Sequence, residues 1–144
     1  MQAVRGRRPR FRDTADPPGR AARRFQAALA QRPAEVRRVA GLLCDLVRSV
    51  APGASQHFVP GWQALAFRDR AEFCFIRPRN TGVTLGFYRG DRLPDPERVL
   101  CGFAKRIRFV RIRTPEDLET AHIAHLISSA LVVSAAEAVA FPTC

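Results

Sequence analysis

A chain of 144 residues, of which 47% are hydrophobic, is long enough to form one domain around its own core. Its formal net charge of +11 favours anionic partners over metal cations. The four cysteines form no CxxC pair and no Cys/His cluster, so we expect reduced thiols rather than a disulfide framework.

The first 24 residues differ in composition from the rest of the chain. They contain eight arginines and two aspartates, together with Pro9, Pro17 and Pro18, and they have few apolar side chains to bury. We therefore expect residues 1–24 to form a disordered basic tail. The tail is either a solvated extension or an arm that binds nucleic acid by neutralising phosphates.

No membrane or export segment is expected. The N-terminal arginines are not followed by the apolar segment that a secretory or Tat signal requires. The longest apolar run, residues 123–141, is interrupted by His125 and Glu137, which argues against a membrane span. These observations predict a cytoplasmic protein without a membrane partner.

The first predicted helix begins at Pro33. Apolar residues then recur at helical spacing over residues 36–50, and charged residues occupy the opposite side, so the helix is amphipathic. Pro52 and Gly53 end it, because proline and glycine both break helices.

Strand patterns follow this helix. Pro60-Gly61 has the sequence of a type II turn, which requires glycine at a position with positive φ. Asn80-Thr81-Gly82 is typical of a second hairpin turn. The predicted strands cover residues 55–59, 62–67, 72–77, 83–88 and 106–113.

Two of these strands carry special features. Apolar and polar side chains alternate over residues 83–88, so one face of the strand is apolar. Gly86 lies within this strand and leaves room for another backbone or for a ligand. In the last strand the apolar phase slips between Phe109 and Val110, which indicates either a bulge or burial on both faces.

Two helix starts are marked by proline. Asp95 before Pro96 predicts an N-cap and a short helix that runs to Leu100. Thr114 before Pro115 predicts the start of a final helix, whose first turn is acidic.

The order of these elements predicts an α+β two-layer sandwich. We expect an antiparallel sheet of four to six strands, with an N-terminal and a C-terminal helix packed on one face. The domain should span residues 25–138, and residues 139–144 should form a C-terminal tail.

Several short motifs occur together between residues 33 and 130. They are Ala51-Pro52-Gly53-Ala54, Gly61-Trp62, Phe73-Cys74, Leu85-Gly86-Phe87-Tyr88-Arg89-Gly90, Leu93-Pro94-Asp95-Pro96 and the basic strand after Lys105. In combination they resemble the YdhG-like domain family, a group of small bacterial domains of largely unknown function. The resemblance implies a sheet with helices on one face. Relatives often have a glycine-threonine-glycine-lysine loop where this chain has Gly102-Phe103-Ala104-Lys105, and the phenylalanine weakens the case for a backbone anion site there.

Some members of that family resemble frataxin, which implies an iron-chaperone role as an alternative function. Iron binding of that type needs clustered carboxylates, whereas the first predicted helix offers only Glu35 and Asp45 among arginines. Glu119, His122 and His125 share the predicted final helix, but no second helix offers partner ligands. We therefore expect no metal site.

Sequence patterns for catalysis are not found. The serines lie outside any GxSxG context, and no cysteine lies in a nucleophile signature. The glycines form neither a P-loop nor a dinucleotide-binding fingerprint. We expect no enzymatic activity and no cofactor.

An aromatic and basic patch is the remaining candidate site. Aromatic rings stack planar ligands and guanidinium groups bind phosphate or carboxylate, so the patch predicts a binding or adaptor module for an anionic ligand or an acidic protein surface. Alternatively, the arginines only cover an exposed sheet face while Trp62 and Tyr88 close the core. The candidate residues are Trp62, Tyr88, Arg89, Lys105, Arg106, Arg108 and Arg111.

Overall fold

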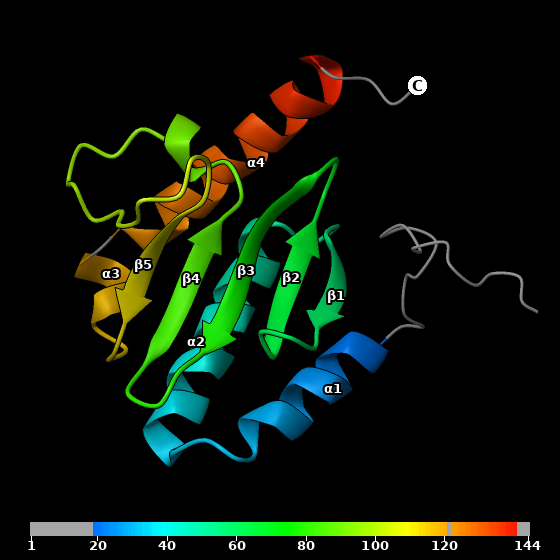
Figure 1. The fold of residues 1–144 in the computed structure, drawn as a ribbon, viewed down its shortest axis with the longest axis vertical. Coiled ribbons are helices and arrows are strands. Elements are labelled where there is room, and N and C mark those ends of the chain that lie inside the picture. Colours follow the sequence, from blue (N-terminus) through cyan, green and yellow to red (C-terminus); the bar gives the residue numbers. More distant parts are fainter. Residues whose placement is uncertain (1–18, 121, 141–144) are drawn as a thin grey trace, which may run out of the picture.

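The computed structural model describes residues 19–120 and 122–140. Two helices precede five strands, and two helices follow them (Figure 1). The elements are α1 Arg20–Leu29, α2 Ala34–Val50, β1 Ser55–Val59, β2 Ala64–Arg68, β3 Glu72–Pro78, β4 Val83–Phe87, the short 3₁₀ helix η2 Gly90–Arg92, β5 Arg108–Ile112, α3 Asp117–Thr120 and α4 Ile123–Ala140.

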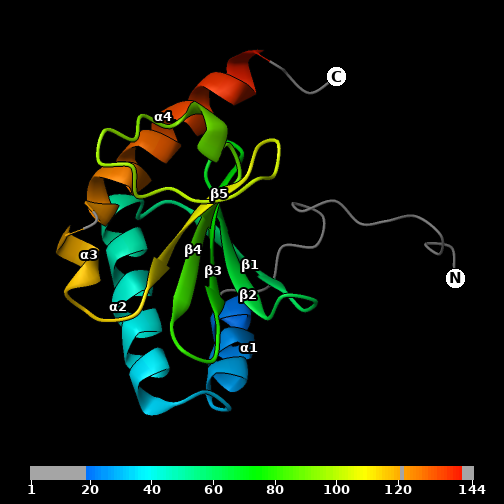
Figure 2. The ribbon, with the colours of Figure 1, turned by 60° about the vertical axis from the view of Figure 1, so that its left-hand side comes forward.

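The five strands form one antiparallel sheet in the order β1-β2-β3-β4-β5, so each strand pairs with its neighbours in the chain. Helices α2 and α4 lie on one side of this sheet, and the loop that precedes β5 projects on the other side (Figure 2). Helix α1 contacts β1 and β2, and its buried residues belong to the same core. The predicted α+β sandwich, with helices on one face of the sheet, is confirmed.

The core between the helices and the sheet follows from two residue periodicities. In α2 the buried residues recur every three or four positions, as a helix with one apolar side requires. In β4 the alternate residues Val83, Leu85 and Phe87 are at most 1% exposed and point toward the helices. The largest contribution to folding comes from this layer, because burial of apolar surface is the dominant favourable term.

The opposite face of the sheet carries a second, smaller apolar cluster. Its buried members are Ala64, Ala66 and Phe75, which lie on β2 and β3. The Phe75 ring packs over Gly86 of the neighbouring strand. The space at Gly86, which the sequence predicted for another backbone or a ligand, therefore holds a side chain of this chain.

The N-terminal helix α1 was not predicted. Residues 20–24, which we expected in the basic tail, form its first half, and Ala21 and Phe25 are buried in the core. The rest of the predicted tail, residues 1–18, lies outside the described residues. At the other end α4 continues to Ala140, past the predicted domain end at residue 138, and residues 141–144 lie outside the described part.

The turn between β1 and β2 differs from the predicted type II turn. Gln63, not Gly61, has a positive φ of 52°. The amides of Trp62 and Gln63 donate to the carbonyls of Val59 and Pro60, at 3.2 and 3.1 Å. The two successive turns end in one left-handed residue, which lengthens the loop and starts β2 at residue 64 instead of 62.

The short helix predicted at residues 95–100 is wrong. The Asp95 carboxylate accepts hydrogen bonds from the amides of Val99 and Leu100, at 2.9 and 3.0 Å, and so closes a non-helical turn. Arg98 has a φ of 54°, which is incompatible with a continuing right-handed helix. The helical turn in this region is instead η2, upstream of Asp95.

The apolar phase slip in the last strand reflects burial on both faces, not a bulge. The pairing of β4 with β5 is continuous from Val83 and Ile112 to Phe87 and Arg108. Phe109 is half-buried opposite Gly86, on the face away from the helices. The irregular register lies in β2 instead, between Phe67 and Arg68.

The final helix is divided into α3 and α4. The Asp117 carboxylate accepts hydrogen bonds from the amides of Arg113 and Thr114, which ends β5 and starts α3. His122 has a φ of 54° at the junction between the two helices. Glu119 therefore does not share one continuous helix with His122 and His125, as the sequence had indicated.

Candidate functional site

A cavity lies between α4, the end of the sheet and the loop of residues 104–107. Its volume is about 560 Å³. The apolar wall includes Phe73, Phe87, Leu93 and Ala130, all of them buried. Charged residues also line it: Arg68, Glu72, Arg89, Lys105, Arg106 and Glu137. We refer to this cavity as the cleft.

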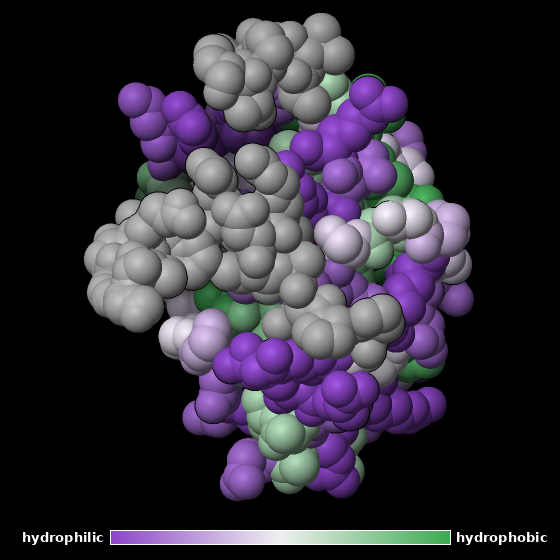
Figure 3. All heavy atoms as spheres, turned by 90° about the vertical axis from the view of Figure 1, so that its right-hand side faces the viewer, coloured by the Kyte–Doolittle hydropathy of each residue, from purple (hydrophilic) through white to green (hydrophobic). Residues whose placement is uncertain are grey.

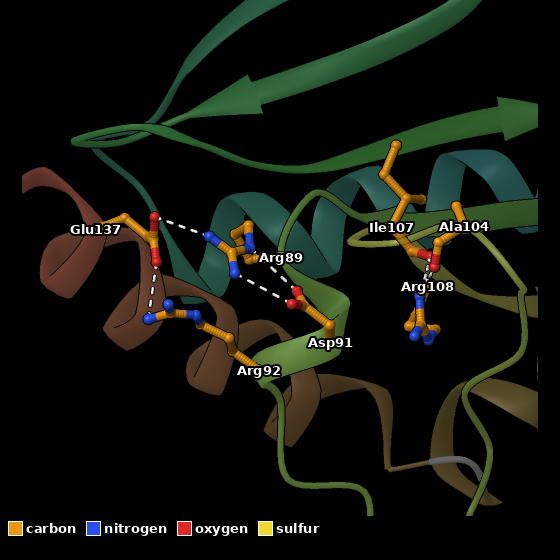
Figure 4. Close-up of polar contacts among 7 residues, drawn as sticks. All are labelled: Arg89, Asp91, Arg92, Ala104, Ile107, Arg108 and Glu137. Atoms are coloured by element: carbon orange, nitrogen blue, oxygen red, sulfur yellow. Dashed lines mark hydrogen bonds and ion pairs between the residues drawn. The ribbon is translucent and has the colours of Figure 1, made fainter. Parts of the chain in front are cut away.

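Arg89 forms ion pairs with two carboxylates of this chain. Its guanidinium group donates two hydrogen bonds to Asp91, at 3.0 and 3.1 Å, and lies 3.0 Å from Oε1 of Glu137 (Figure 4). Arg92 lies 3.0 Å from Oε2 of the same glutamate. The hydrogen bonds to Asp91 raise the pKa of Arg89 and lower that of Asp91. This network joins η2 to α4 at one wall of the cleft, so Arg89 serves to position that wall.

Arg108 supports the loop that forms the opposite wall. Its guanidinium group donates to the carbonyl oxygens of Ala104 and Ile107, the latter at 2.9 Å (Figure 4). Its aliphatic part packs on Gly90, where an added Cβ would lie 2.4 Å from the Cβ of Arg108. Arg108 is therefore a positioning residue for the loop, and the predicted direct ligand contact from this side chain has no geometric support.

Lys105 and Arg106 are the exposed cations of the cleft. The amide of Asp91 donates to the Arg106 carbonyl at 3.0 Å, which fixes the loop next to η2. Both side chains extend from this loop and are exposed. Within the described residues, neither side chain makes an ion pair with a carboxylate, so both remain available to an anion at the mouth of the cleft.

Two hydroxyl groups line the cleft. Tyr88 is half-buried, and its burial together with nearby Glu72 raises the pKa of the phenol, so the hydroxyl stays protonated and can donate a hydrogen bond. Ser134 accepts a hydrogen bond from the Ala71 amide at 2.9 Å and donates one to the Ala71 carbonyl at 3.0 Å. Ser134 thereby joins α4 to the β2–β3 turn.

The other two candidate residues lie in a second depression, on the face of the sheet opposite the helices. This sheet-face groove has a volume of about 230 Å³ and is lined by Trp62, Phe75, Arg77, Arg79, Thr84, Gly102, Phe103, Ala104, Ile107, Phe109 and Arg111. None of these lining residues is acidic. The guanidinium carbon of Arg77 lies 5.8 Å from the Trp62 ring centroid, and that of Arg111 lies 5.8 Å from the Phe109 ring centroid.

The seven candidate residues therefore do not form one concave surface. Tyr88, Arg89, Lys105 and Arg106 line the cleft, Trp62 and Arg111 line the groove, and Arg108 supports the loop between the two. Ala104 and Ile107, which were not predicted, contribute to both depressions.

Other residues of the two sites were also missed. Arg77 was identifiable in principle, because it follows Phe75 at a spacing of two residues and so lies on the same face of β3. Glu137 is 48 residues from Arg89 in the chain, and a single sequence carries no signal for that contact.

Metal ligation has little geometric support. Within residues 19–120 and 122–140, no group of three or more His, Cys, Asp or Glu side chains is placed to hold a metal ion. Glu35 and Asp45 are exposed on α2, and Asp45 forms an ion pair with Arg48 at 3.6 Å. No arrangement around these two acids favours the iron-chaperone alternative.

The surface of the described residues is largely hydrophilic on the side shown in Figure 3, with smaller apolar patches between the polar side chains. None of the described helices has both the length and the hydrophobicity needed to span a bilayer.

Comparison with known proteins does not identify a relative. No family model matches the chain, and no curated protein or solved structure matches it significantly. The resemblance to the YdhG-like family therefore stays a prediction from the motifs.

Proposed function

We propose that this protein is a cytoplasmic, non-catalytic binding module of the YdhG-like type. Its ligand in the cleft is a small, largely apolar molecule that carries one carboxylate or phosphate group. The observation that carries this proposal is the combination of a buried apolar wall with two exposed cations, Lys105 and Arg106, at the edge of one cavity of about 560 Å³. Cavities of several hundred Å³ with an apolar lining and a few polar groups are typical of small-molecule sites.

The charges of the cleft favour an anionic group. Glu137 is neutralised by Arg89 and Arg92, whereas Glu72 contributes a negative charge at the wall. Arg68 also lines the cleft, so its charged side chains include four cations and two carboxylates, and a cationic ligand would be repelled by Lys105 and Arg106. The anionic group of the proposed ligand would contact Lys105 and Arg106, and its apolar part would pack against Leu93 and Phe87.

A binding role agrees with the hydroxyl groups of the cleft. Ser134 makes two hydrogen bonds to the backbone of Ala71, so its hydroxyl is not paired with a base. Tyr88 stays protonated at neutral pH because burial raises its pKa. Neither group is activated as a nucleophile in the way that covalent catalysis requires.

Calorimetric titration with matched ligands tests the proposal. The ligand series should pair aryl or alkyl carboxylates and phosphate monoesters of graded size with their neutral amides or alcohols. We expect binding of the anions only, and a roughly 10-fold or greater loss of affinity in the Lys105→Ala/Arg106→Ala double variant. The double variant Arg37→Ala/Arg38→Ala, which removes two exposed arginines from α2, is the matched control for net charge.

A second variant tests the apolar wall separately. Val133 is half-buried and lines the cleft, so Val133→Phe should fill part of the cavity and weaken binding of the larger ligands more than that of the smaller ones. Equal binding of acids and their neutral analogues, or unchanged affinity in both the double variant and Val133→Phe, would contradict the proposal.

A further inference from the structure

We propose that the sheet-face groove binds single-stranded nucleic acid, with bases stacked on its aromatic rings and phosphates held by its arginines. This proposal is independent of the ligand of the cleft, because the two sites share only Ala104 and Ile107. The groove is lined by four aromatic side chains and three arginines, and none of its lining residues is acidic.

Two of the rings are available for stacking. Phe103 is fully exposed and Trp62 is 36% exposed, although both are large apolar side chains. Phe103 lies in the loop next to the groove and contributes nothing to either apolar cluster. Exposed rings that line the same groove are typical of an interaction surface.

Trp62 is supported from below. Its ring centroid lies 4.9 Å from that of Phe75, at an interplanar angle of 46°. Phe75 in turn packs over Gly86 and lies 5.3 Å from the ring of Tyr88. Because the supporting rings are already packed, little conformational entropy is lost when a base stacks on Trp62.

The arginines are placed beside the rings. Arg77 and Arg111 both pair with Thr84, from β3 and β5 respectively, so they lie on either side of β4 at the same level of the sheet. Arg79 directly follows β3, in the turn before β4, and Arg32 reaches the same turn through a 3.0 Å hydrogen bond to Asn80. The pKa of Arg77 is lowered by burial and by the nearby charges of Arg79 and Arg32, so an anion here would relieve repulsion between cations.

The groove combines aromatic rings with arginines, and the candidate ligands differ in whether they can contact both. An acidic peptide would use the arginines but leave Phe103 and Trp62 without a planar partner. Duplex nucleic acid offers phosphates, but its bases are stacked on one another and cannot reach the rings. A single strand supplies both groups, and such binding depends on aromatic stacking combined with a basic surface.

Trp62 is the only tryptophan of the chain, so its fluorescence reports on this site alone. We would titrate the full-length protein with mixed-sequence single-stranded RNA and DNA of about 12 nucleotides, and with the duplex of the same sequence. Binding is followed both by anisotropy of a labelled strand and by quenching of Trp62. We expect quenching by the single strands and weaker binding of the duplex.

Two variants at exposed positions separate stacking from charge. Phe103→Ala should weaken binding by roughly 5- to 150-fold, the range expected for one stacked base, without changing the salt dependence. Arg111→Gln should reduce the slope of log affinity against log salt by about 0.7, the value for one phosphate contact of a single strand. Arg38→Gln on α2 is the control with the same change of charge.

The arginine-rich residues 1–18 are the competing explanation for any nucleic-acid binding. A full-length variant with glutamine at Arg5, Arg7, Arg8, Arg10 and Arg12 should still show quenching of Trp62. The proposal is overturned if the single strands do not quench Trp62, or if the glutamine variant of the N-terminal arginines no longer binds nucleic acid. It is also overturned if the duplex binds as tightly as the single strands, or if Phe103→Ala and Arg111→Gln bind with the affinity of the control Arg38→Gln. The proposal would also be overturned if inorganic phosphate or an acidic peptide displaced the labelled strand as effectively as unlabelled single-stranded nucleic acid does.

Discussion

The ring of Phe75 occupies the position where a side chain at Gly86 would begin. A Cβ at Gly86 would lie 2.1 Å from Cζ of Phe75, a distance that non-bonded carbon atoms do not adopt. Phe75 is 5% exposed and lies between the rings of Trp62 and Tyr88, so it has little freedom to move aside. Glycine at position 86 thus permits the aromatic layer on the outer face of the sheet.

Gly86→Ala should destabilise the fold by roughly 1–3 kcal/mol, the usual cost of overpacking. The displaced Phe75 should also change the emission of Trp62 in the native state. Chemical denaturation followed by Trp62 fluorescence measures both effects. Gly53→Ala is the control, because a Cβ there meets no atom within 4 Å, and it should keep or raise stability by up to about 1 kcal/mol. Equal stability of the two variants would refute the packing argument.

The Arg89–Asp91 pair predicts a loss of stability in acid. Arg89 lowers the pKa of Asp91 below its ordinary value of 3.8, so the folded protein binds this proton less readily than the unfolded chain. The contribution of Asp91 is therefore fully present well above pH 3.8 and is lost as the pH falls below that value.

Asp91→Asn isolates this contribution. The free energy of unfolding should fall less steeply with acidification in Asp91→Asn than in the wild type, so the two curves should converge at low pH. Asp45→Asn removes an exposed acid on α2 and controls for the change in net charge. A constant difference between wild type and Asp91→Asn from neutral pH to about pH 2.5 would show that Asp91 is not linked to folding in this way.

Arg108 should control the order of the loop that carries Lys105. Its guanidinium group donates to two carbonyls of that loop, so Arg108→Ala should release the loop while the core stays folded. Lys105 is the only lysine of the chain, and a lysine-specific protease therefore cuts at one site. We expect cleavage to be about five times faster in Arg108→Ala, which corresponds to the loss of about 1 kcal/mol of local stability.

The exposed variant Arg113→Ala should be cleaved at the wild-type rate, since Arg113 makes no contact that holds this loop among the described hydrogen bonds. If a carboxylate or phosphate ligand of the cleft is found, its addition should slow cleavage at Lys105. Wild-type cleavage kinetics in Arg108→Ala would rule out the supporting role of Arg108.

The cysteines should differ in reactivity. Burial raises the pKa of Cys44 to about 12 and also raises that of Cys74, so both remain thiols near neutral pH. Cys101 is exposed. Brief treatment with a maleimide should label Cys101 and leave Cys44 and Cys74 unmodified until denaturant is added, as peptide mass spectrometry can show. Rapid native labelling of Cys44 or Cys74 would contradict their placement in the core.

Local pattern was sufficient for α2 and for the presence of five strands, although β5 covers Arg108–Ile112 and not the predicted residues 106–113. The apolar spacing over residues 36–50 and the alternation of Val83, Leu85 and Phe87 are determined by helix and strand geometry, and both appear in the structure as expected. The predictions for the turn after β1 and for a helix at residues 95–100 were wrong. In these two places a side-chain hydrogen bond or a single residue with positive φ determines the backbone path. The Asp95 carboxylate closes a turn instead of capping a helix, and Gln63 takes the positive φ expected at Gly61.

Helix α1 was missed for a different reason. Ala21, Phe25 and Leu29 recur every four residues and are buried in the structure, but they lie in a segment whose arginine content is typical of a solvated tail. The arginine content describes the segment as a whole, whereas packing against the core depends only on the apolar residues on one side of the helix. The apolar positions at that spacing were the better signal.

By itself the sequence determined the fold class, because the periods of helix and strand decide which side chains face the core and local order is encoded along the chain. It also supplied the cations and rings that a binding site needs. Only the tertiary structure decided how those residues divide between a cleft and a groove. Glu137 forms an ion pair with Arg89, which lies 48 residues away in the chain. The register of the strands places Arg77 and Arg111 on either side of β4. Such contacts depend on how distant segments pack, and the spacing of residues within one segment carries no record of them.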